Sequence, residues 1–519
     1  MDSPSAAGDC LYPGAKLHSP SSCYKVLSVL GEGTFGKVAK CRKLDNNKTV
    51  AVKMIRNQGN FAVQAKFEIE ALQKIQMLEN SKPHLVQWNS TFSDMGYICL
   101  EFEYLDKSLF DFMKERNFKP LQVKEIRPIV HQLARALEHL KAACMIHADL
   151  KLENIMFINH QQQPYRVKVI DFGLTHEISD ARQGSYIQSR PYRSPEILVG
   201  APYNEAIDMW SVGCVTAFLY TGTLIFPGKN DYEMIRFITE TQGPFPDSLL
   251  ASGKKTGHFF HRENETNLWS IKTTEKYQQE TGIVVKTVRK LKLSSLDHLL
   301  QLQQFQWCFT KHPSDQVVYS ADKQMFVDML KGMFQLDASQ RMTPLQVLDH
   351  HFISMSHLWP HFAASPHVRF CYGIMAACES KAPNSKKSGA LQQNTSKTTP
   401  SVLHKLASER TNKKTGPCRT KNRAQSGQKK KTKDEVVKQP KRFCKKIKTE
   451  AQHSCMSDHL YVKPMVDSTQ PRQVAGKGNL TRTKRAKNAK QCTDLHAEKK
   501  PRMTLRKDKR KEIIPTTDD

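Results

Sequence analysis

The stretch His147-Ala148-Asp149-Leu150-Lys151-Leu152-Glu153-Asn154, with Asp171-Phe172-Gly173 a short strand later, decides the fold class of this chain. Both stretches end apolar segments, so we expect their polar side chains to lie on loops at the ends of buried elements. Asn154 and Asp171 offer the hard oxygen ligands that Mg²⁺ prefers. The sequence therefore predicts a magnesium site where the two loops meet.

Two further side chains of the first stretch fit phosphoryl transfer. Asp149 can accept the proton of a hydroxyl, and Lys151 can meet the transferred phosphoryl group. This chemistry depends on holding a metal–triphosphate in line with the hydroxyl and on neutralising charge. Each piece alone has a plain alternative, since Asp-Phe-Gly is usually a simple turn and Asp-x-x-x-x-Asn recurs by chance. All of the pieces in this order favour the catalytic interpretation.

Upstream, Leu30-Gly31-Glu32-Gly33-Thr34-Phe35-Gly36-Lys37-Val38 places three glycines between two predicted strands. Glycine lets the backbone approach phosphate oxygens and leaves N–H groups free to point at negative charge. The same spacing occurs in tight hairpins and in dinucleotide-binding folds. The dinucleotide version requires a helix directly after the glycines, whereas Val38-Ala39-Lys40-Cys41 is typical of a strand.

Lys53 ends the apolar run Val50-Ala51-Val52-Lys53, where a charge is costly unless it meets an anion. The plain alternative is an edge-strand lysine that points to water. The functional interpretation is a phosphate-binding lysine held by a carboxylate of the following helix, either Glu68 or Glu70. We favour Glu68, because Leu72 would share its inward face.

Together these residues resemble the signature set of the protein kinases, and more closely the homeodomain-interacting protein kinases, from about residue 24 to residue 378. The closer resemblance is carried by 147–151, 164–173, 186–190, 205–211 and 239–243. It implies an α+β, bilobal protein-kinase fold, with a small β-rich N-lobe containing one main helix (about 24–105) and a large α-helical C-lobe (about 106–353).

The resemblance also implies ATP and Mg²⁺ as cofactors and assigns the site residue by residue. Asp149, Lys151 and Asn154 are then catalytic, and Asn154 and Asp171 hold the metal. The implied ATP-binding residues are Leu30, Gly31, Glu32, Gly33, Thr34, Phe35, Gly36, Val38, Ala51, Lys53, Glu68, Glu103 and Leu105.

A tyrosine of the activation loop is autophosphorylated in this group of kinases, and Tyr186 occupies its position. Ala148 stands where many kinases have an arginine that grips a phosphorylated loop. Arg190 and Arg193 could pair with a phosphate on Tyr186 instead, although a solvated or substrate-facing charge pair is an equal alternative. The resemblance further pairs Glu196, at the end of this segment, with Arg341.

Three positions depart from the family pattern. Leu152 replaces a proline, Pro191 stands in place of an aromatic residue, and Ser194 replaces alanine. None of these changes deletes a chemical group, so they bear on substrate preference and rate more than on activity itself.

Apolar patterning predicts strands over 25–30, 49–55 and 97–102. Helices are expected over 65–78, 109–115, 123–143, 206–220, 230–241 and 323–334, and residues 260–320 resemble an insertion on the helical lobe. The predicted organisation is a flexible segment over 1–23, a kinase domain over 24–353, an extension over 354–378, and a disordered Lys/Arg-rich tail over 379–519.

The net charge of +29 is unevenly distributed along the 519 residues. Residues 371–519 carry 37 Lys and Arg against 13 Asp and Glu, whereas the rest of the chain is only slightly basic. With three aromatic residues, this tail cannot bury enough apolar surface to fold. Its dense basic runs suit nuclear import or non-specific nucleic-acid binding, although a solvated linker is as good an interpretation for any one run.

Thirteen cysteines without a Cys-x-x-Cys pair and a start without an apolar core predict a reducing compartment, free thiols and no structural zinc. The 20 uncharged residues between Asp208 and Lys229 are long enough to span a bilayer, but their Gly, Ser and Thr content favours a buried helix followed by a loop.

We therefore expect a Ser/Thr protein kinase that acts on Ser/Thr-Pro sites, is activated by tyrosine autophosphorylation, and takes part in transcription or stress signalling. Its partners would be protein substrates such as transcription regulators, with nucleic acid or an import receptor at the tail and no membrane. We expect it in the nucleus, with the cytoplasm as a second location. The alternative is a weakly active or inactive kinase-like scaffold that binds nuclear partners or nucleic acid through the tail.

Overall fold

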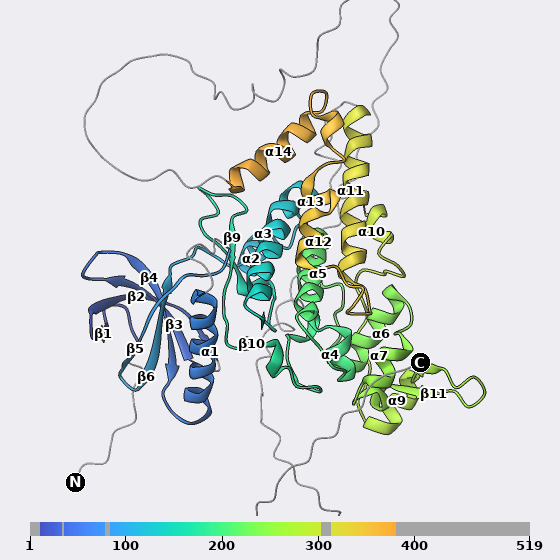
Figure 1. Ribbon diagram of the computed structural model, residues 1–519, viewed down its shortest axis with the longest axis horizontal. Helices are drawn as coiled ribbons and strands as arrows, with labels where there is room; N and C mark the ends of the chain where they lie inside the picture. The colour runs from blue at the N-terminus through green and yellow to red at the C-terminus, as the bar shows by residue number, and fades with distance from the viewer. Residues whose placement is uncertain (1–10, 34–35, 78–83, 303–312, 380–519) are drawn as a thin grey trace, which may run out of the picture. The chain divides into compact units, whose positions relative to one another are not determined.

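The computed structural model describes residues 11–33, 36–77, 84–302 and 313–379 (Figure 1). The predictions made for Thr34, for Phe35 and for the basic tail beyond residue 379 lie outside these residues.

An antiparallel sheet of six strands forms the N-terminal part, in the order β1-β2-β3-β4-β6-β5. The strands are β1 (Lys16–Ser19), β2 (Ser22–Gly33), β3 (Gly36–Lys43), β4 (Thr49–Arg56), β5 (Trp88–Asp94) and β6 (Tyr97–Glu103). Burial alternates along β4, where Val50, Val52 and Met54 face a core of their own beneath the sheet. Helix α1 (Gly59–Met77) lies beside the sheet (Figure 1).

The expectation of a flexible segment over 1–23 is wrong for residues 16–23. Strand β1 pairs with β2 from Lys16 opposite Lys25 to Ser19 opposite Ser22, and Leu17 is fully buried. Leu11, Ala15 and Leu17 are buried, but Ser, Pro and Gly residues lie around them in the sequence. The sequence therefore shows only a weak apolar pattern here.

The helical part begins after β6 and is built around α5 (Ala206–Thr221), whose residues 207–220 are all buried. The other helices are α2 (Leu109–Glu115), α3 (Val123–Ala142), α4 (Pro195–Val199), α6 (Asp231–Gln242), α7 (Asp247–Ser252), α8 (Thr256–Phe259), α9 (Thr274–Thr281), α10 (His298–Gln301), α11 (Pro313–Met333), α12 (Pro344–Asp349), α13 (His351–Ser354) and α14 (Pro366–Glu379). Trp210 of α5 stacks on Phe226 and meets Phe334 edge-on, at the centre of this core.

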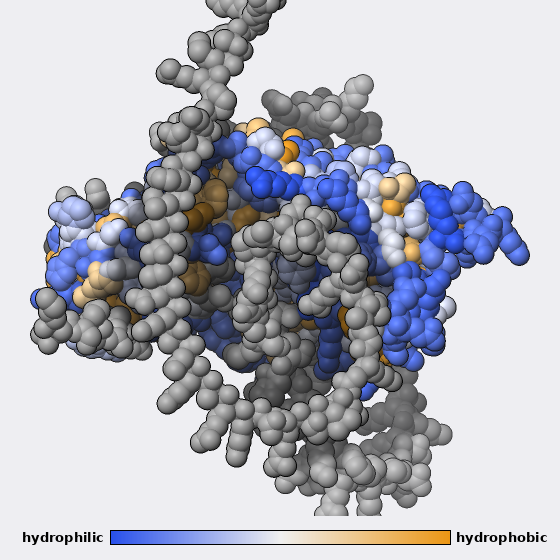
Figure 2. Space-filling model, turned by 90° about the horizontal axis from the view of Figure 1, so that it is seen from below, coloured by the Kyte–Doolittle hydropathy of each residue, from blue (hydrophilic) through white to orange (hydrophobic). Residues whose placement is uncertain are grey.

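Burial of α5 on every side accounts for the uncharged stretch in the sequence. Within the described ranges, no helix is long and apolar enough to cross a membrane. Among the residues coloured in Figure 2, hydrophilic ones predominate, as expected when the apolar side chains are collected inside.

Helix boundaries were predicted best where apolar residues alone occupy the buried positions. Helix α2 spans Leu109–Glu115, the predicted range. Helix α1 begins at Gly59 rather than near residue 65, because its first turns are partly exposed and carry no apolar pattern. Helix α11 begins ten residues before the predicted 323, because two of its early buried positions hold the carboxylates Asp315 and Asp322.

Two short strand pairs bracket the loops that carry the quoted motifs. Strand β7 (Met145–Ile146) pairs with β10 (His176–Glu177), and β8 (Ile155–Phe157) pairs with β9 (Val167–Val169). The expected insertion contains a further pair, β11 (Phe260–Arg262) with β12 (Trp269–Ile271). It packs onto the helical part through Tyr277, whose ring stacks on Tyr232 of α6 at 4.1 Å.

Candidate active site

The loop after β7 is held from below by a buried carboxylate of α5. Asp208 accepts hydrogen bonds from the backbone N–H groups of His147 at 2.7 Å and of Ala148 at 2.9 Å. The His147 ring packs edge-on against Phe172 of the second motif, with ring centroids 5.3 Å apart. Asp208 thus holds the first loop, and the His147 ring of that loop packs against the second, so buried side chains position both loops.

Three donors surround the carboxylate of Asp149. Lys151 Nζ lies 2.8 Å and Asn154 Nδ2 lies 3.1 Å from Oδ2, while the Ser189 hydroxyl donates to Oδ1 at 2.7 Å. Burial alone would lower the pKa of Lys151, but the Asp149 charge outweighs it and raises that pKa, which keeps the ammonium protonated. Ser189 could not be predicted from the sequence, because a hydroxyl 40 residues away along the chain gives no spacing signal.

Lys53, Glu68 and Asp171 form a second charged group. Lys53 Nζ lies 2.7 and 2.8 Å from the two carboxylate oxygens of Glu68, and 2.8 Å from Asp171 Oδ1. Glu68 is buried and Glu70 is exposed, so the structure selects the expected partner of Lys53. Burial alone would raise the pKa of Asp171, but the neighbouring Lys53 ammonium holds that pKa well below its usual range.

Little space is left beside Gly173 in this group. A Cβ at Gly173 would lie 3.3 Å from Asp171 Oδ1 and 3.6 Å from Glu68 Oε2. In the upstream segment, a Cβ at Gly36 would overlap the carbonyl oxygen of Met54 in the neighbouring strand, whereas Gly31 and Gly33 have open space around them. Pairing of the two strands thus requires glycine at position 36. A Cβ at Gly31 or Gly33 would meet no atom of the described residues within 4 Å.

The remaining residues assigned to ATP lie along the same sheet. Val38 of β3 is opposite both Gly31 of β2 and Lys53 of β4, and Ala51 is opposite Phe102 of β6. Leu30 and Glu32 of β2 are exposed, and Leu105, just beyond β6, is buried.

Glu103, which is also assigned to ATP, is the last residue of β6. Its side chain contacts Lys168 and accepts a hydrogen bond from the Gln87 N–H at 2.7 Å. The side chain is therefore already engaged by protein groups.

The side chains fit Mg²⁺ with ATP. The Asp171 side chain keeps 41% of its surface exposed although one oxygen pairs with Lys53. Asn154 directs its Nδ2 at the carbonyl oxygen and at Oδ2 of Asp149, so its amide oxygen faces the other way. A carboxylate and an amide oxygen next to a lysine form a donor set suited to a metal-bound phosphate.

In the segment that follows Asp171-Phe172-Gly173, the cationic side chains of Arg190 and Arg193 contact Tyr186. Arg190 donates to the phenol oxygen at 3.1 Å, and the Arg193 guanidinium lies 4.1 Å above the ring. Burial alone would raise the pKa of Tyr186, but Arg193 and Arg190 outweigh it and lower that pKa. Because Arg193 is buried and also pairs with Asp231 at 2.8 Å, it is not a solvated surface charge.

Glu196 of α4 and Arg341 form the expected buried ion pair. Its two N–O contacts measure 2.6 and 3.0 Å, and the guanidinium also lies 5.3 Å from the centre of the Trp210 ring. The pair ties the end of the segment that contains Tyr186 to the core of the helical part.

The three departures from the family pattern are accommodated without loss of packing. Leu152 is fully buried in the main core, and Pro191 lies in a 3₁₀ turn, η3 (Arg190–Tyr192), whose first positions tolerate proline. The Ser194 hydroxyl and N–H both donate to the side-chain oxygen of Gln188, at 3.0 and 2.9 Å. Ser194 therefore adds a buried hydrogen bond that alanine would lack.

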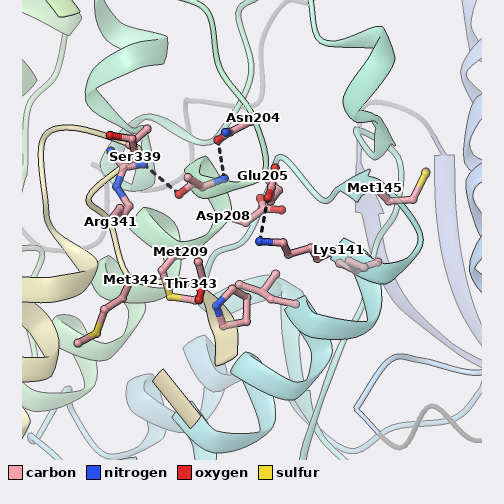
Figure 3. A pocket seen from close by; sticks show the side chains of 15 residues that line it. Lys141, Met145, Asn204, Glu205, Asp208, Met209, Ser339, Arg341, Met342 and Thr343 are labelled. Carbon is pink, nitrogen blue, oxygen red and sulfur yellow. Dashed lines mark hydrogen bonds and ion pairs between the residues drawn. The ribbon is translucent and has the colours of Figure 1, made fainter. Parts of the chain in front are cut away.

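A separate pocket of about 190 Å³ lies between α3, the start of α5 and the start of α12 (Figure 3). Lys141 and Glu205 form an ion pair across it at 3.2 Å, and Asp208 and Arg341 contribute to its wall. None of the residues assigned to catalysis, ATP or metal lines this pocket.

Comparison with known proteins agrees with this geometry. The family model described as protein kinase domain matches residues 24–353. Homeodomain-interacting protein kinase 2 of Mesocricetus auratus is 42% identical over 367 residues, which are 70% of this chain and 31% of the relative. Homeodomain-interacting protein kinase 1 of Mus musculus is also 42% identical, with 70% of this chain and 30% of the relative covered.

A third relative, homeodomain-interacting protein kinase 4 of Mus musculus, is 38% identical over 66% of this chain and 57% of its own length. The chain thus spans less than two thirds of the length of these relatives. Within the matched region, the predicted protein-kinase fold and the resemblance to the homeodomain-interacting protein kinases are confirmed.

Proposed function

This chain belongs to the protein kinase family, and we propose that it transfers the γ-phosphoryl group of ATP to serine and threonine hydroxyls, with Mg²⁺ bound, at Ser-Pro and Thr-Pro sites. The observation that carries the proposal is the joint placement of Asp149, Lys151 and Asn154 on one loop, opposite Asp171 and Lys53. The preference for proline after the acceptor rests on the resemblance to the homeodomain-interacting kinases.

In this proposal each side chain has one task. Lys53, fixed by Glu68, holds the phosphates of the nucleotide, and Asn154 and Asp171 hold the metal. Asp149 accepts the proton of the acceptor hydroxyl, and Lys151 neutralises the charge that develops beside it. Mg²⁺, when bound, supplies charge neutralisation on the phosphate oxygens.

Ser189 positions the proton acceptor. Its hydroxyl donates to Asp149 Oδ1, while Lys151 and Asn154 contact Oδ2, so the plane of the carboxylate is fixed from both sides. We assign Ser189 this positioning role because it reaches the carboxylate from the segment that also carries Tyr186.

Autophosphorylation of Tyr186 would complete the active segment. A phosphate on the phenol oxygen would meet Arg190, which already donates to that oxygen, and would lie near Arg193. Such charge-assisted bonds order a loop. Tyr186→Phe should therefore lower turnover strongly, with mass spectrometry of the wild type locating phosphate on Tyr186, and unchanged turnover would remove the switch from the proposal.

We further propose a nuclear role in transcription or stress signalling, with transcription regulators among the substrates. The support is the name of the homeodomain-interacting relatives and the basic tail of this chain. Loss of nuclear accumulation after removal of residues 380–519 would be the expected result, and unchanged distribution would contradict a role of the tail in import.

The second candidate is a kinase-like scaffold that binds nuclear partners or nucleic acid through the basic tail. It is favoured by the departures at Leu152 and Pro191. The full-length protein should be offered ATP, Mg²⁺ and a matched pair of Ser-Pro and Ser-Ala peptides. Phosphate transfer to the Ser-Pro peptide supports the kinase, equal transfer to both peptides removes the proline preference, and ATP binding without transfer favours the scaffold.

A further inference from the structure

A buried cluster of three different metal-ligating side chains lies far from the candidate active site, where α14 packs on α11. Asp322 comes from α11, and His367 and Cys371 lie four residues apart on α14. Residues at this spacing share one face of a helix, so both α14 side chains point at the same carboxylate. Asp322 and Cys371 are fully buried, and the His367 side chain is 12% exposed.

The distances between the three side chains fit a tetrahedral metal ion. His367 Nε2 lies 3.6 Å from Cys371 Sγ and 3.7 Å from Asp322 Oδ2. A zinc ion with bonds of about 2.3 Å to sulfur and about 2.0 Å to nitrogen or oxygen holds such ligand atoms roughly 3.5 Å apart. A direct hydrogen bond would bring His367 Nε2 and Asp322 Oδ2 to about 2.9 Å. The 3.6 Å contact between His367 Nε2 and Cys371 Sγ is also a hydrogen-bond distance for sulfur.

A second observation concerns one oxygen atom of the same cluster, Asp322 Oδ2. Among the described residues, none donates a hydrogen bond to Asp322 Oδ2, although this atom is buried. Such an atom is costly to leave without a partner. The buried Asp322 Oδ2 therefore lies near the His367 imidazole and the Cys371 thiol without a hydrogen bond to either.

The other carboxylate oxygen is already held by the surroundings. Asp322 Oδ1 pairs with the buried Arg127 of α3 and lies 3.0 Å from His357 Nε2. Groups of this kind orient metal ligands in known sites, since the oxygen that does not bind the metal accepts hydrogen bonds. Arg127 also interacts with the Cys371 side chain.

We propose that Asp322, His367 and Cys371 bind a zinc ion that fastens α14 to α11. A mixed set of one sulfur, one nitrogen and one oxygen ligand suits zinc better than magnesium or calcium, which prefer oxygen alone. The proposal differs from the expectation of no structural zinc, which rested on the absence of Cys-x-x-Cys pairs and could not place a helix beside a distant aspartate.

The full-length chain, expressed with zinc and dialysed against metal-free buffer, provides the test. Elemental analysis should find about one zinc per chain fewer in Cys371→Ser and in His367→Gln than in the wild type. Cys378→Ser, on the same helix, and His361→Gln, on the preceding turn, are matched controls and should keep the wild-type content, because neither residue belongs to the cluster.

Cobalt gives a second readout of the sulfur ligand. Co²⁺ added to metal-depleted wild type and to Cys378→Ser should produce the absorption band of a cobalt–thiolate bond, and Cys371→Ser should lose it. Should a variant fail to fold, shown by lost circular dichroism, the other variant and the wild-type band still decide the question. Equal zinc content in wild type and both variants, or a cobalt band that survives in Cys371→Ser, would overturn the proposal.

Discussion

The two carboxylate oxygens of Glu68 lie 2.7 and 2.8 Å from the ammonium of Lys53, which joins helix α1 to strand β4. The same ammonium lies 2.8 Å from Asp171, so one lysine connects the sheet, the helix and the loop of the second motif. Glu68 is the buried member and has lost its hydration, which makes its pairing with Lys53 important for the whole group.

Glu68→Gln should lower kcat/KM for peptide phosphorylation by roughly 10- to 100-fold, because the amide cannot hold the Lys53 ammonium with two charge-assisted bonds. Glu70→Gln is the matched control, two residues along the same helix and exposed. Steady-state kinetics of both variants check the prediction. Equal losses in the two variants would show that the effect comes from the helix and not from the ion pair.

Ser189→Ala should reduce kcat about tenfold with little change in the KM for ATP, since one hydrogen bond to Asp149 is removed while the nucleotide contacts remain. Ser185→Ala is the control, because its hydroxyl donates to the carbonyl of Arg182 in the same loop. A Ser189→Ala enzyme with wild-type kcat would contradict the positioning role.

Arg341→Met should lower the free energy of unfolding by roughly 3 kcal/mol, because it leaves the buried Glu196 carboxylate without its partner. Lys331→Met removes an exposed pair with Asp297 and should cost less than about 1 kcal/mol. Urea unfolding followed by tryptophan fluorescence compares the two, and the prediction fails if their midpoints shift equally.

The stability of the fold should fall between pH 6.5 and pH 4 through His84. Burial, with smaller contributions from His131, His139, Arg166 and Lys168, lowers the pKa of His84 from 6.5 to about 4. The unfolded chain therefore binds a proton in this window that the folded chain refuses, so the stabilisation present above pH 6.5 is lost as the pH falls.

At pH 5 this loss amounts to about 2 kcal/mol for a fully realised shift. Urea unfolding at pH 7 and pH 5 measures it. His84→Gln should flatten the difference between the two pH values, and an unaltered difference in that variant would assign the effect to other groups.

The sequence was sufficient to predict several of the main elements of the fold and the local motifs. Strands β4 and β6 and helices α2, α3, α5 and α6 lie within one or two residues of the expected ranges, because most of their buried positions are apolar. The Lys53–Glu68 pair was also predictable, since helical periodicity favours Glu68 over Glu70.

Contacts between distant segments could not be predicted in the same way. Ser189 reaches Asp149 across 40 residues, and Asp322 meets Cys371 on another helix, so no local spacing relates them. Strand β1 was missed for a related reason, because its burial depends on pairing with β2 and not on its own composition. In each case the sequence does not reveal which distant residue or strand will be the partner in the folded chain.

The most direct test of the account is phosphate transfer from radiolabelled ATP, with Mg²⁺, to a Ser-Pro peptide by the full-length chain. The wild type should transfer phosphate, and both Asp149→Asn and Asp171→Asn should lose transfer by at least roughly 100-fold. Asp180→Asn, an exposed aspartate nine residues after Asp171, should retain it. Transfer by Asp149→Asn at the wild-type rate would contradict the central claim that this loop carries the chemistry.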